Sequence, residues 1–198
     1  AAARHDDGAA RLPETGDERQ RQLTRMGNAA WAAGLSWLMA GRREEAGSWL
    51  RRAAETYRRS WEGAPPGSWG RPIGAMKSRL IAGDAEGAAE DARWALDAGA
   101  ARSESPIGIY AAVLGHLALG EDDAAGELGR GLRGRDDFPA PVALSLVALA
   151  AGDAEGYERA IRALVADFEG REAFIQDTAR AATVLAPPAL PQEPGPPA

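Results

Sequence analysis

A turn built on glycine recurs four times along the chain, and this recurrence constrains the fold more than any other feature. Each of these glycines is followed by a charged residue and preceded, three positions earlier, by a leucine. A bulky residue stands ten positions before each glycine and a small one nine positions before it. The glycines, spaced 42, 37 and 32 residues apart, are Gly41, Gly83, Gly120 and Gly152. Agreement at so many offsets predicts a chain of repeated structural units.

Apolar residues follow helical spacing on both sides of each glycine. The bulky residue and the leucine are two helical turns apart, so they share one face of a helix that ends at the glycine. In the second unit these residues are Ile73 and Leu80, and Lys77 is the one polar residue that interrupts the stripe. The residues that stand five, nine and twelve positions after each glycine are apolar or small, and this spacing predicts a second amphipathic helix. Each unit is therefore expected to be a pair of antiparallel helices.

Residues at the turns and at the helix starts support this prediction. Glycine can end a helix in the left-handed conformation, and an Asp or Glu after it suits the positive start of the next helix. Pro72, Pro106 and Pro141 each suit a first helical turn, where no amide hydrogen is needed, and they lie 34 and 35 residues apart. They predict where the leading helix, the first of each new pair, begins. The longer interval from Pro106 to Gly120 predicts a leading helix that is one turn longer.

Stacking of the helix pairs defines the expected architecture, because one pair cannot cover its own apolar faces. We expect an all-α fold, a right-handed α-solenoid of about four antiparallel helical hairpins, over residues 17–186. A stripe from Phe174 to Leu185 predicts a capping helix over the last pair. Residues 1–16 are rich in Gly and polar side chains and residues 187–198 are rich in proline, which predicts flexible tails.

The turn resembles that of the tetratricopeptide repeat, a helix-turn-helix unit of 34 residues. In that family the turn glycine is followed five residues later by alanine. The matching pairs here are Gly41 with Ala46, Gly83 with Ala88, and Gly120 with Ala125, whereas Gly152 is followed by Tyr157. The resemblance covers roughly residues 28–169. It implies binding of proteins or peptides in a groove lined by the leading helices.

Composition narrows the classes of function. The chain has no cysteine and only two histidines, which excludes disulfides, thiol nucleophiles and Cys/His metal sites. Phosphate-binding glycine loops, nucleophile elbows and zinc-binding helix motifs are absent from the sequence, so we expect no cofactor and no catalysis. The net charge of −6 argues against bulk attraction to nucleic acid or anionic lipid. No apolar stretch reaches membrane-spanning length, so a soluble, cytoplasmic protein is expected.

Positions that vary between units while their neighbours stay constant are candidates for recognition. Four residues before each glycine the chain carries Trp37, Arg79, His116 and Ala148. Asn28, Arg71 and Lys77 lie on the leading helices or at their starts. These residues predict a mixed basic and aromatic groove that suits an acidic segment or a C-terminal carboxylate of a protein or peptide. The alternative is that they are buried or solvated side chains with no ligand.

The segment 61–71 is the least repeat-like stretch inside the predicted domain. It contains Trp61 and Trp69 around two adjacent prolines. A tryptophan beside a proline turn can anchor an interface, so Trp69 joins the candidate partner-binding residues. Packing of the indole over the neighbouring hairpin is the alternative.

Three hypotheses for function follow. The first is a non-enzymatic module that binds a protein segment or a second copy of the chain, as an adaptor, a scaffold or a specific inhibitor of the immunity type. The second is a small all-helical enzyme with His116 as acid and base. The third is a nucleic-acid binder that uses Arg51, Arg52, Arg58 and Arg59. Glutamates interspersed among these arginines favour a solvated, salt-bridged helix face instead.

Overall fold

A computed structural model describes residues 16–62, 64–65, 67–135 and 139–168. Within these ranges the chain forms eight α-helices and one short 3₁₀ helix, with no β-strand, which confirms the all-helical class. No helix in this part of the chain combines the length and the apolar character needed to cross a membrane. The predicted capping helix at 174–185 and the predicted tails lie outside the described residues, apart from Gly16, which begins the first described helix.

Consecutive helices pack side by side in pairs. The pairs are α2 (Gly16–Met39) with α3 (Arg43–Trp61), α4 (Gly70–Ile81) with α5 (Ala85–Asp97), α6 (Pro106–Ala118) with α7 (Asp122–Arg130), and α8 (Ala140–Ala150) with α9 (Ala154–Phe168). The 3₁₀ helix η1 (Ala100–Arg102) lies between α5 and α6 in the chain and contacts both.

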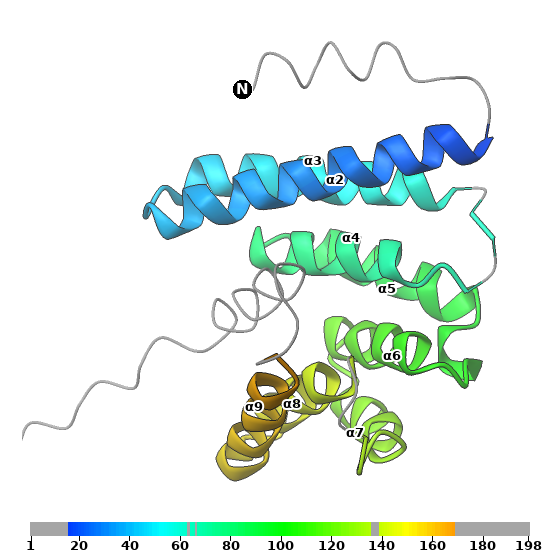
Figure 1. The fold of residues 1–198 in the computed structure, drawn as a ribbon, viewed down its shortest axis with the longest axis vertical. Helices are drawn as coiled ribbons and strands as arrows, with labels where there is room; N and C mark the ends of the chain where they lie inside the picture. Colours follow the sequence, from blue (N-terminus) through cyan, green and yellow to red (C-terminus); the bar gives the residue numbers. More distant parts are fainter. Residues whose placement is uncertain (1–15, 63, 66, 136–138, 169–198) are drawn as a thin grey trace, which may run out of the picture.

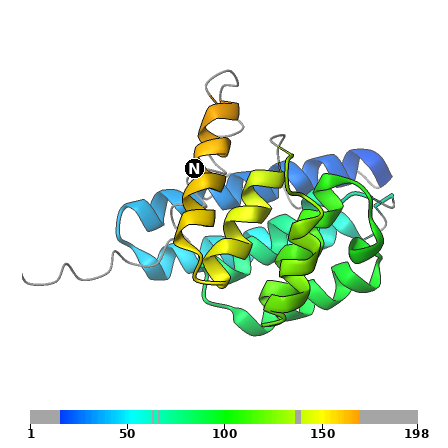
Figure 2. The same ribbon diagram turned by 90° about the horizontal axis from the view of Figure 1, so that it is seen from below.

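Each pair also contacts the next one. The second helix of each pair packs on the following leading helix, and α4, α6 and α8 contact one another in succession. Figure 1 shows the pairs following one another from α2 and α3 at one end to α8 and α9 at the other. Figure 2, seen from below, shows that α8 and α9 cross the direction of α2 steeply, so the helix direction turns along the molecule.

The turn inside each pair contains the predicted left-handed glycine. The φ angles are 77°, 75°, 73° and 67° at Gly41, Gly83, Gly120 and Gly152. In every turn the glycine amide donates to the carbonyl of the leucine three residues earlier, and the next amide donates to the carbonyl five residues before it. This Schellman arrangement satisfies carbonyl groups that the helix end leaves free. Asp84 and Asp153 then cap the next helices by accepting hydrogen bonds from the Gly87 and Gly156 amides.

The three prolines lie in first helical turns, as predicted, but at different positions within them. Pro106 is the first residue of α6, Pro141 the second of α8 and Pro72 the third of α4. The prediction that the helix after Pro106 is one turn longer is therefore wrong, because α4, α6 and α8 have 12, 13 and 11 residues. The two residues before Pro72 already belong to α4, and they make up most of the expected difference in length between α4 and α6.

The predicted apolar stripes face the interior, but the leucine column is less buried than the rest. The bulky column is buried at all four positions, which are Trp31, Ile73, Tyr110 and Val142. Leu38, Leu80, Leu117 and Leu149 are only half-buried. Each of these leucines lies in the last turn of its helix, next to the exposed glycine turn, where fewer neighbouring side chains cover it.

Tyr57 of α3 inserts its ring between α2 and α4. A Cβ atom placed on Gly27 of α2 or on Gly74 of α4 would lie 2.9 Å from ring carbons of Tyr57. Both helices therefore approach the ring as closely as a residue without a side chain allows. The hydroxyl extends beyond the ring and donates a hydrogen bond to Asn28 Oδ1 at 2.6 Å.

Replacement of Gly74 by alanine tests this close approach. We expect Gly74→Ala to lower the free energy of unfolding by about 1–2 kcal/mol, because the ring cannot move away from the new methyl group without striking Gly27. The matched control is Gly126→Ala in α7, where a Cβ atom meets nothing within 4 Å. This replacement should stabilise the helix by about 0.5–1 kcal/mol. Urea denaturation followed by circular dichroism measures both, and equal gains in stability would contradict the packing of Tyr57.

Candidate functional site

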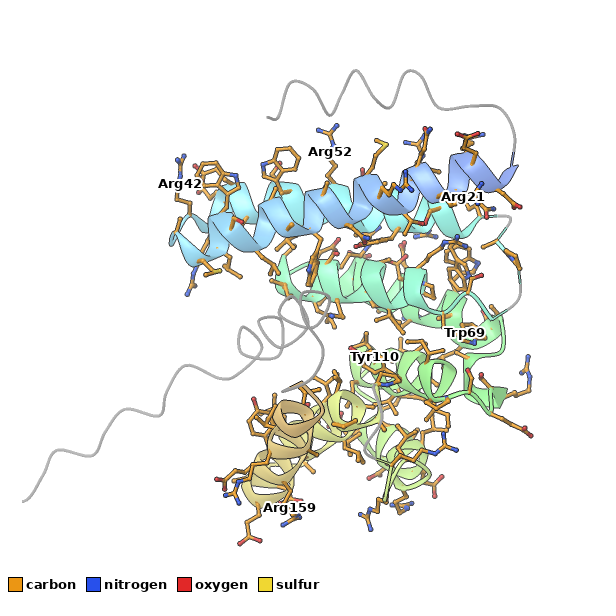
Figure 3. The ribbon with its side chains drawn as sticks, viewed as in Figure 1. Arg21, Arg42, Arg52, Trp69, Tyr110 and Arg159 are labelled. Atoms are coloured by element: carbon orange, nitrogen blue, oxygen red, sulfur yellow. The ribbon has the colours of Figure 1, made fainter. Side chains whose placement is uncertain are left out.

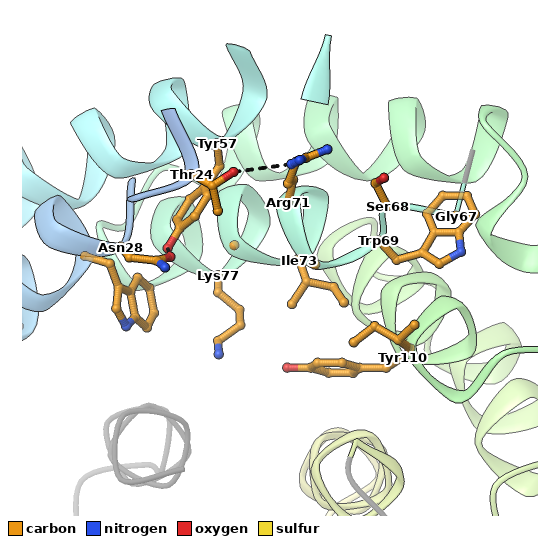
Figure 4. Close-up of a pocket in the computed structure, with 14 residues that line it drawn as sticks. Thr24, Asn28, Tyr57, Gly67, Ser68, Trp69, Arg71, Ile73, Lys77 and Tyr110 are labelled. Atoms are coloured by element: carbon orange, nitrogen blue, oxygen red, sulfur yellow. Dashed lines mark hydrogen bonds between the residues drawn. The ribbon is translucent and has the colours of Figure 1, made fainter. Parts of the chain in front are cut away.

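The leading helices α2, α4 and α6 line a pocket of about 520 Å³, which we call the leading-helix pocket (Figure 4). Its volume lies in the range of small-ligand and peptide-side-chain sites. Residues of α3 and of the connection 67–69 complete it. The side chains that line it belong to Thr24, Asn28, Trp31, Tyr57, Ser68, Trp69, Arg71, Ile73, Lys77, Ile107 and Tyr110.

Buried residues of the bulky column form the apolar wall of the pocket. Trp31, Ile73 and Tyr110 occupy corresponding positions in three successive leading helices, and each is at most 8% exposed. Because these helices lie next to one another, the same column that fills the core also borders the pocket. Their spacing in the sequence predicts packing alone, so none of them is among the predicted partner-binding residues.

Polar groups from two helix pairs meet on another side of the pocket. Arg71 Nε donates to Thr24 Oγ1 at 3.4 Å, and Thr24 in turn donates to the Gln20 carbonyl at 2.9 Å. Arg71 Nη1 is closed off from solvent and has no hydrogen-bond partner among the described residues. A buried donor without an acceptor is costly, and more so when it is charged. An anionic group next to Arg71 would supply the missing acceptor.

The charged side chains among the described lining residues of the pocket are both cationic. Arg71 and Lys77 both line it, and the described residues around it include no Asp or Glu. The Lys77 ammonium lies 5.2 Å from the centre of the Trp31 ring, a cation–π contact. Cationic groups beside aromatic walls suit a ligand that carries both a negative charge and an apolar portion.

Four of the seven predicted partner-binding residues come together in this pocket, namely Asn28, Trp69, Arg71 and Lys77. The other three lie at the turns, where each contacts the residue that follows the glycine. Trp37 stacks under the Arg42 guanidinium at 4.4 Å, Arg79 Nη1 lies 2.6 Å from Asp84 Oδ2, and His116 Nδ1 lies 2.6 Å from Glu121 Oε2. In the first three turns the residue of this column therefore contacts the residue after the glycine, which gives it a role within the helix pair.

Arg79 also belongs to a buried ion-pair network that joins α3, α4 and α5. Asp91 of α5 is fully buried; its Oδ2 accepts a hydrogen bond from Arg79 Nε at 2.8 Å, and its Oδ1 lies 3.3 Å from Arg58 Nη1. Burial raises the pKa of Asp91, although the two arginines oppose this shift. The Gly87 amide, helped by Arg79, lowers the pKa of Asp84 in spite of partial burial. This network holds Arg79 away from the leading-helix pocket.

The arginines of α3 do not form one free basic strip. Arg58 pairs with Glu90 and Asp91 and lies 5.5 Å from the Trp94 ring, while Arg52 lies 5.6 Å from the Trp49 ring. Arg51 and Arg59 are exposed. Figure 3 shows Arg52 extending from the outer side of the first helix pair.

The tryptophans of the segment 61–71 pack within the fold. The ring centroids of Trp61 and Trp69 lie 6.5 Å apart in an edge-to-face arrangement, and Trp61 lies 3.6 Å from Trp94 of α5. Trp61 and Trp69 are 8% and 7% exposed. Trp69 thus combines packing over the next helix pair with a place in the pocket wall.

The sequence pattern indicated some of the pocket residues but not others. Lys77 was visible as the polar residue in an apolar stripe, and this irregularity is explained by its place in the pocket. Tyr57 gave no such signal, because it belongs to a second helix and reaches the pocket only by passing between Gly27 and Gly74. Within the described ranges, no three His, Asp or Glu side chains converge on a possible metal position.

No protein-family model, curated protein or solved structure matches this chain, so the functional argument depends on the geometry of the pocket.

Replacement of Arg79 tests the buried network. We expect Arg79→Met to lower the free energy of unfolding at neutral pH by about 3 kcal/mol, because Asp91 keeps only Arg58 as a counter-ion. A raised pKa means that Asp91 contributes stability when protonated and loses it as pH rises. The penalty should therefore shrink on acidification to about pH 4. Urea denaturation at both pH values measures this penalty. The comparison variant is Trp37→Ala, which should lower the free energy of unfolding by at most about 1 kcal/mol.

An Arg79→Met penalty that is equal at both pH values would contradict a role for carboxylate charge. Addition of Asp91→Asn to Arg79→Met should recover most of the lost stability, because the unpaired buried charge is then removed.

Proposed function

We propose that this chain is a non-enzymatic binding module that holds an acidic segment or a C-terminal carboxylate of a partner protein in the leading-helix pocket. The observation that carries this proposal is the pocket itself: Arg71 and Lys77 lie among aromatic walls, with no carboxylate among the described lining residues. Adaptor, scaffold and inhibitor roles all use such a module, and they differ in the partner.

We further propose that the module is a tetratricopeptide-like, right-handed stack of four helical hairpins. Three features support this architecture: the same left-handed glycine turn in each pair, the contact of each pair with the next, and the successive contacts of the leading helices. In such a stack the leading helices face a common concave side, where the pocket would open.

Charge and burial favour an acidic peptide as the ligand. Arg71 lines the pocket as a cation, and a guanidinium binds carboxylates through paired hydrogen bonds. The apolar surfaces of Trp31, Ile73 and Tyr110 would take an adjacent side chain of the peptide. Because these walls are fixed by the packing of the leading helices, little ordering is needed on binding.

The two alternative functions have less support in the geometry. His116 does pair with Glu121, but neither residue lines the leading-helix pocket, and the pair repeats the turn contact seen in the first two units. Nucleic-acid binding through α3 would have to use Arg58 and Arg52, which already contact acidic or aromatic side chains of the fold.

Selection from a library of soluble random peptides tests the proposed function. Peptides that bind should be enriched in Asp, Glu or a free carboxylate next to apolar residues. Arg71→Met and Lys77→Met should each weaken the selected peptides by about tenfold or more, because each removes a charge while the methionine preserves the packing of the aliphatic stem. Fluorescence polarisation measures the affinities, and thermal denaturation checks that the variants fold.

The matched control is Arg133→Met, which changes the net charge equally at an exposed position outside the pocket. Its affinity should equal that of the wild type. Equal weakening by Arg133→Met would indicate general electrostatic attraction, and enrichment of peptides without acidic groups would contradict the proposed ligand.

A further inference from the structure

Tyr110 places a buried hydroxyl at the leading-helix pocket. Its side chain is 2% exposed and comes from α6, the third leading helix. Its hydroxyl forms no hydrogen bond in the part of the chain that the structure describes, and burial is the sole cause of the change in its pKa. Tyr110 is one of the described residues that line the leading-helix pocket, and Figure 4 draws its hydroxyl beside that space.

If Tyr110 served only the stability of the fold, an unpaired phenol in an apolar wall would be unfavourable. Phenylalanine would fill the same space without leaving a polar group unsatisfied. Burial raises the pKa of Tyr110 well above its usual range, so the hydroxyl stays protonated and can donate a hydrogen bond. Trp31 and Ile73, at the corresponding positions of α2 and α4, offer no hydroxyl.

The surroundings of the hydroxyl define its acceptor. In Figure 4 the Tyr110 hydroxyl and the Lys77 side chain point into the same space beside α4. Described lining residues supply positive charge and no carboxylate. An acceptor that meets both the phenol and the cationic groups is therefore an anionic oxygen.

We propose that the Tyr110 hydroxyl donates a hydrogen bond to a carboxylate oxygen of the bound peptide and so determines the specificity of the pocket for that group. This inference rests on the proposed peptide-binding function and names the contact that selects the ligand. The carboxylate has two possible sources, the C-terminus of the peptide or an acidic side chain within it.

Three matched peptides and one conservative variant test the contact. The probes are acetylated tetrapeptides with the same two leucines: one with a free C-terminal carboxylate and no acidic side chain, one amidated with an internal glutamate, and one amidated with glutamine in its place. Each is titrated into the full chain, wild type and Tyr110→Phe, and binding is followed by NMR chemical shifts. Tyr157→Phe, in α9 and outside the pocket, is the control.

We expect the wild type to prefer at least one carboxylate probe to the glutamine probe. Tyr110→Phe should weaken that probe by about tenfold or more, leave the glutamine probe nearly unchanged, and not lower the denaturation midpoint. If Tyr110→Phe weakens only the probe with the free C-terminal carboxylate, the hydroxyl contacts the chain end of the peptide. If it weakens only the glutamate probe, the hydroxyl contacts an acidic side chain. Tyr157→Phe should match the wild type.

The outcomes separate the two proposals. If the wild type prefers a carboxylate and Tyr110→Phe weakens all probes equally or none, the contact with Tyr110 is wrong while the binding function stands. Binding of all three probes with equal affinity, or of none, overturns the proposed function and this inference with it.

Discussion

The ring of Tyr57 between two glycines is the contact on which the pocket depends. Gly27 and Gly74 bring α2 and α4 against opposite edges of one aromatic ring that projects from α3. The first two helix pairs are thereby held at a separation set by the width of that ring. Its hydroxyl then passes to the pocket side and holds Asn28. A single side chain thus fixes the spacing of two leading helices and contributes to the site between them.

A second constraint acts on α4 nearer to its C-terminal end, at Arg79. The buried carboxylate of Asp91 accepts from Arg79 and lies near Arg58, so α3, α4 and α5 are tied by charge. Ion pairs of this kind favour one geometry because any shift leaves a buried charge unpaired. Helix α4 is therefore fixed by the aromatic ring at Gly74 and by the ion-pair network at Arg79. It presents Ile73 and Lys77 to the pocket.

The local structure could be predicted from the sequence to a large extent. The glycine turns were recognised because a left-handed residue must follow the last helical turn, and all four have positive φ. Prolines marked the first turns of three helices for the same local reason, although their exact positions varied. The bulky column was recognised as buried because its spacing matches one helix face. These features depend on neighbouring residues alone.

The site was predicted only in part, because side chains on one helix can point to different neighbours. Arg71 and Arg79 belong to the same helix and looked alike in sequence, yet one lines the pocket and the other pairs with Asp91. Tyr110 belonged to the predicted packing column and Tyr57 gave no sequence signal, so only the tertiary arrangement places their hydroxyls at the pocket. The sequence by itself determined the helices and turns, through periodicity and glycine and proline geometry. Only the tertiary structure decided which polar groups meet, because that depends on contacts between residues far apart in the chain.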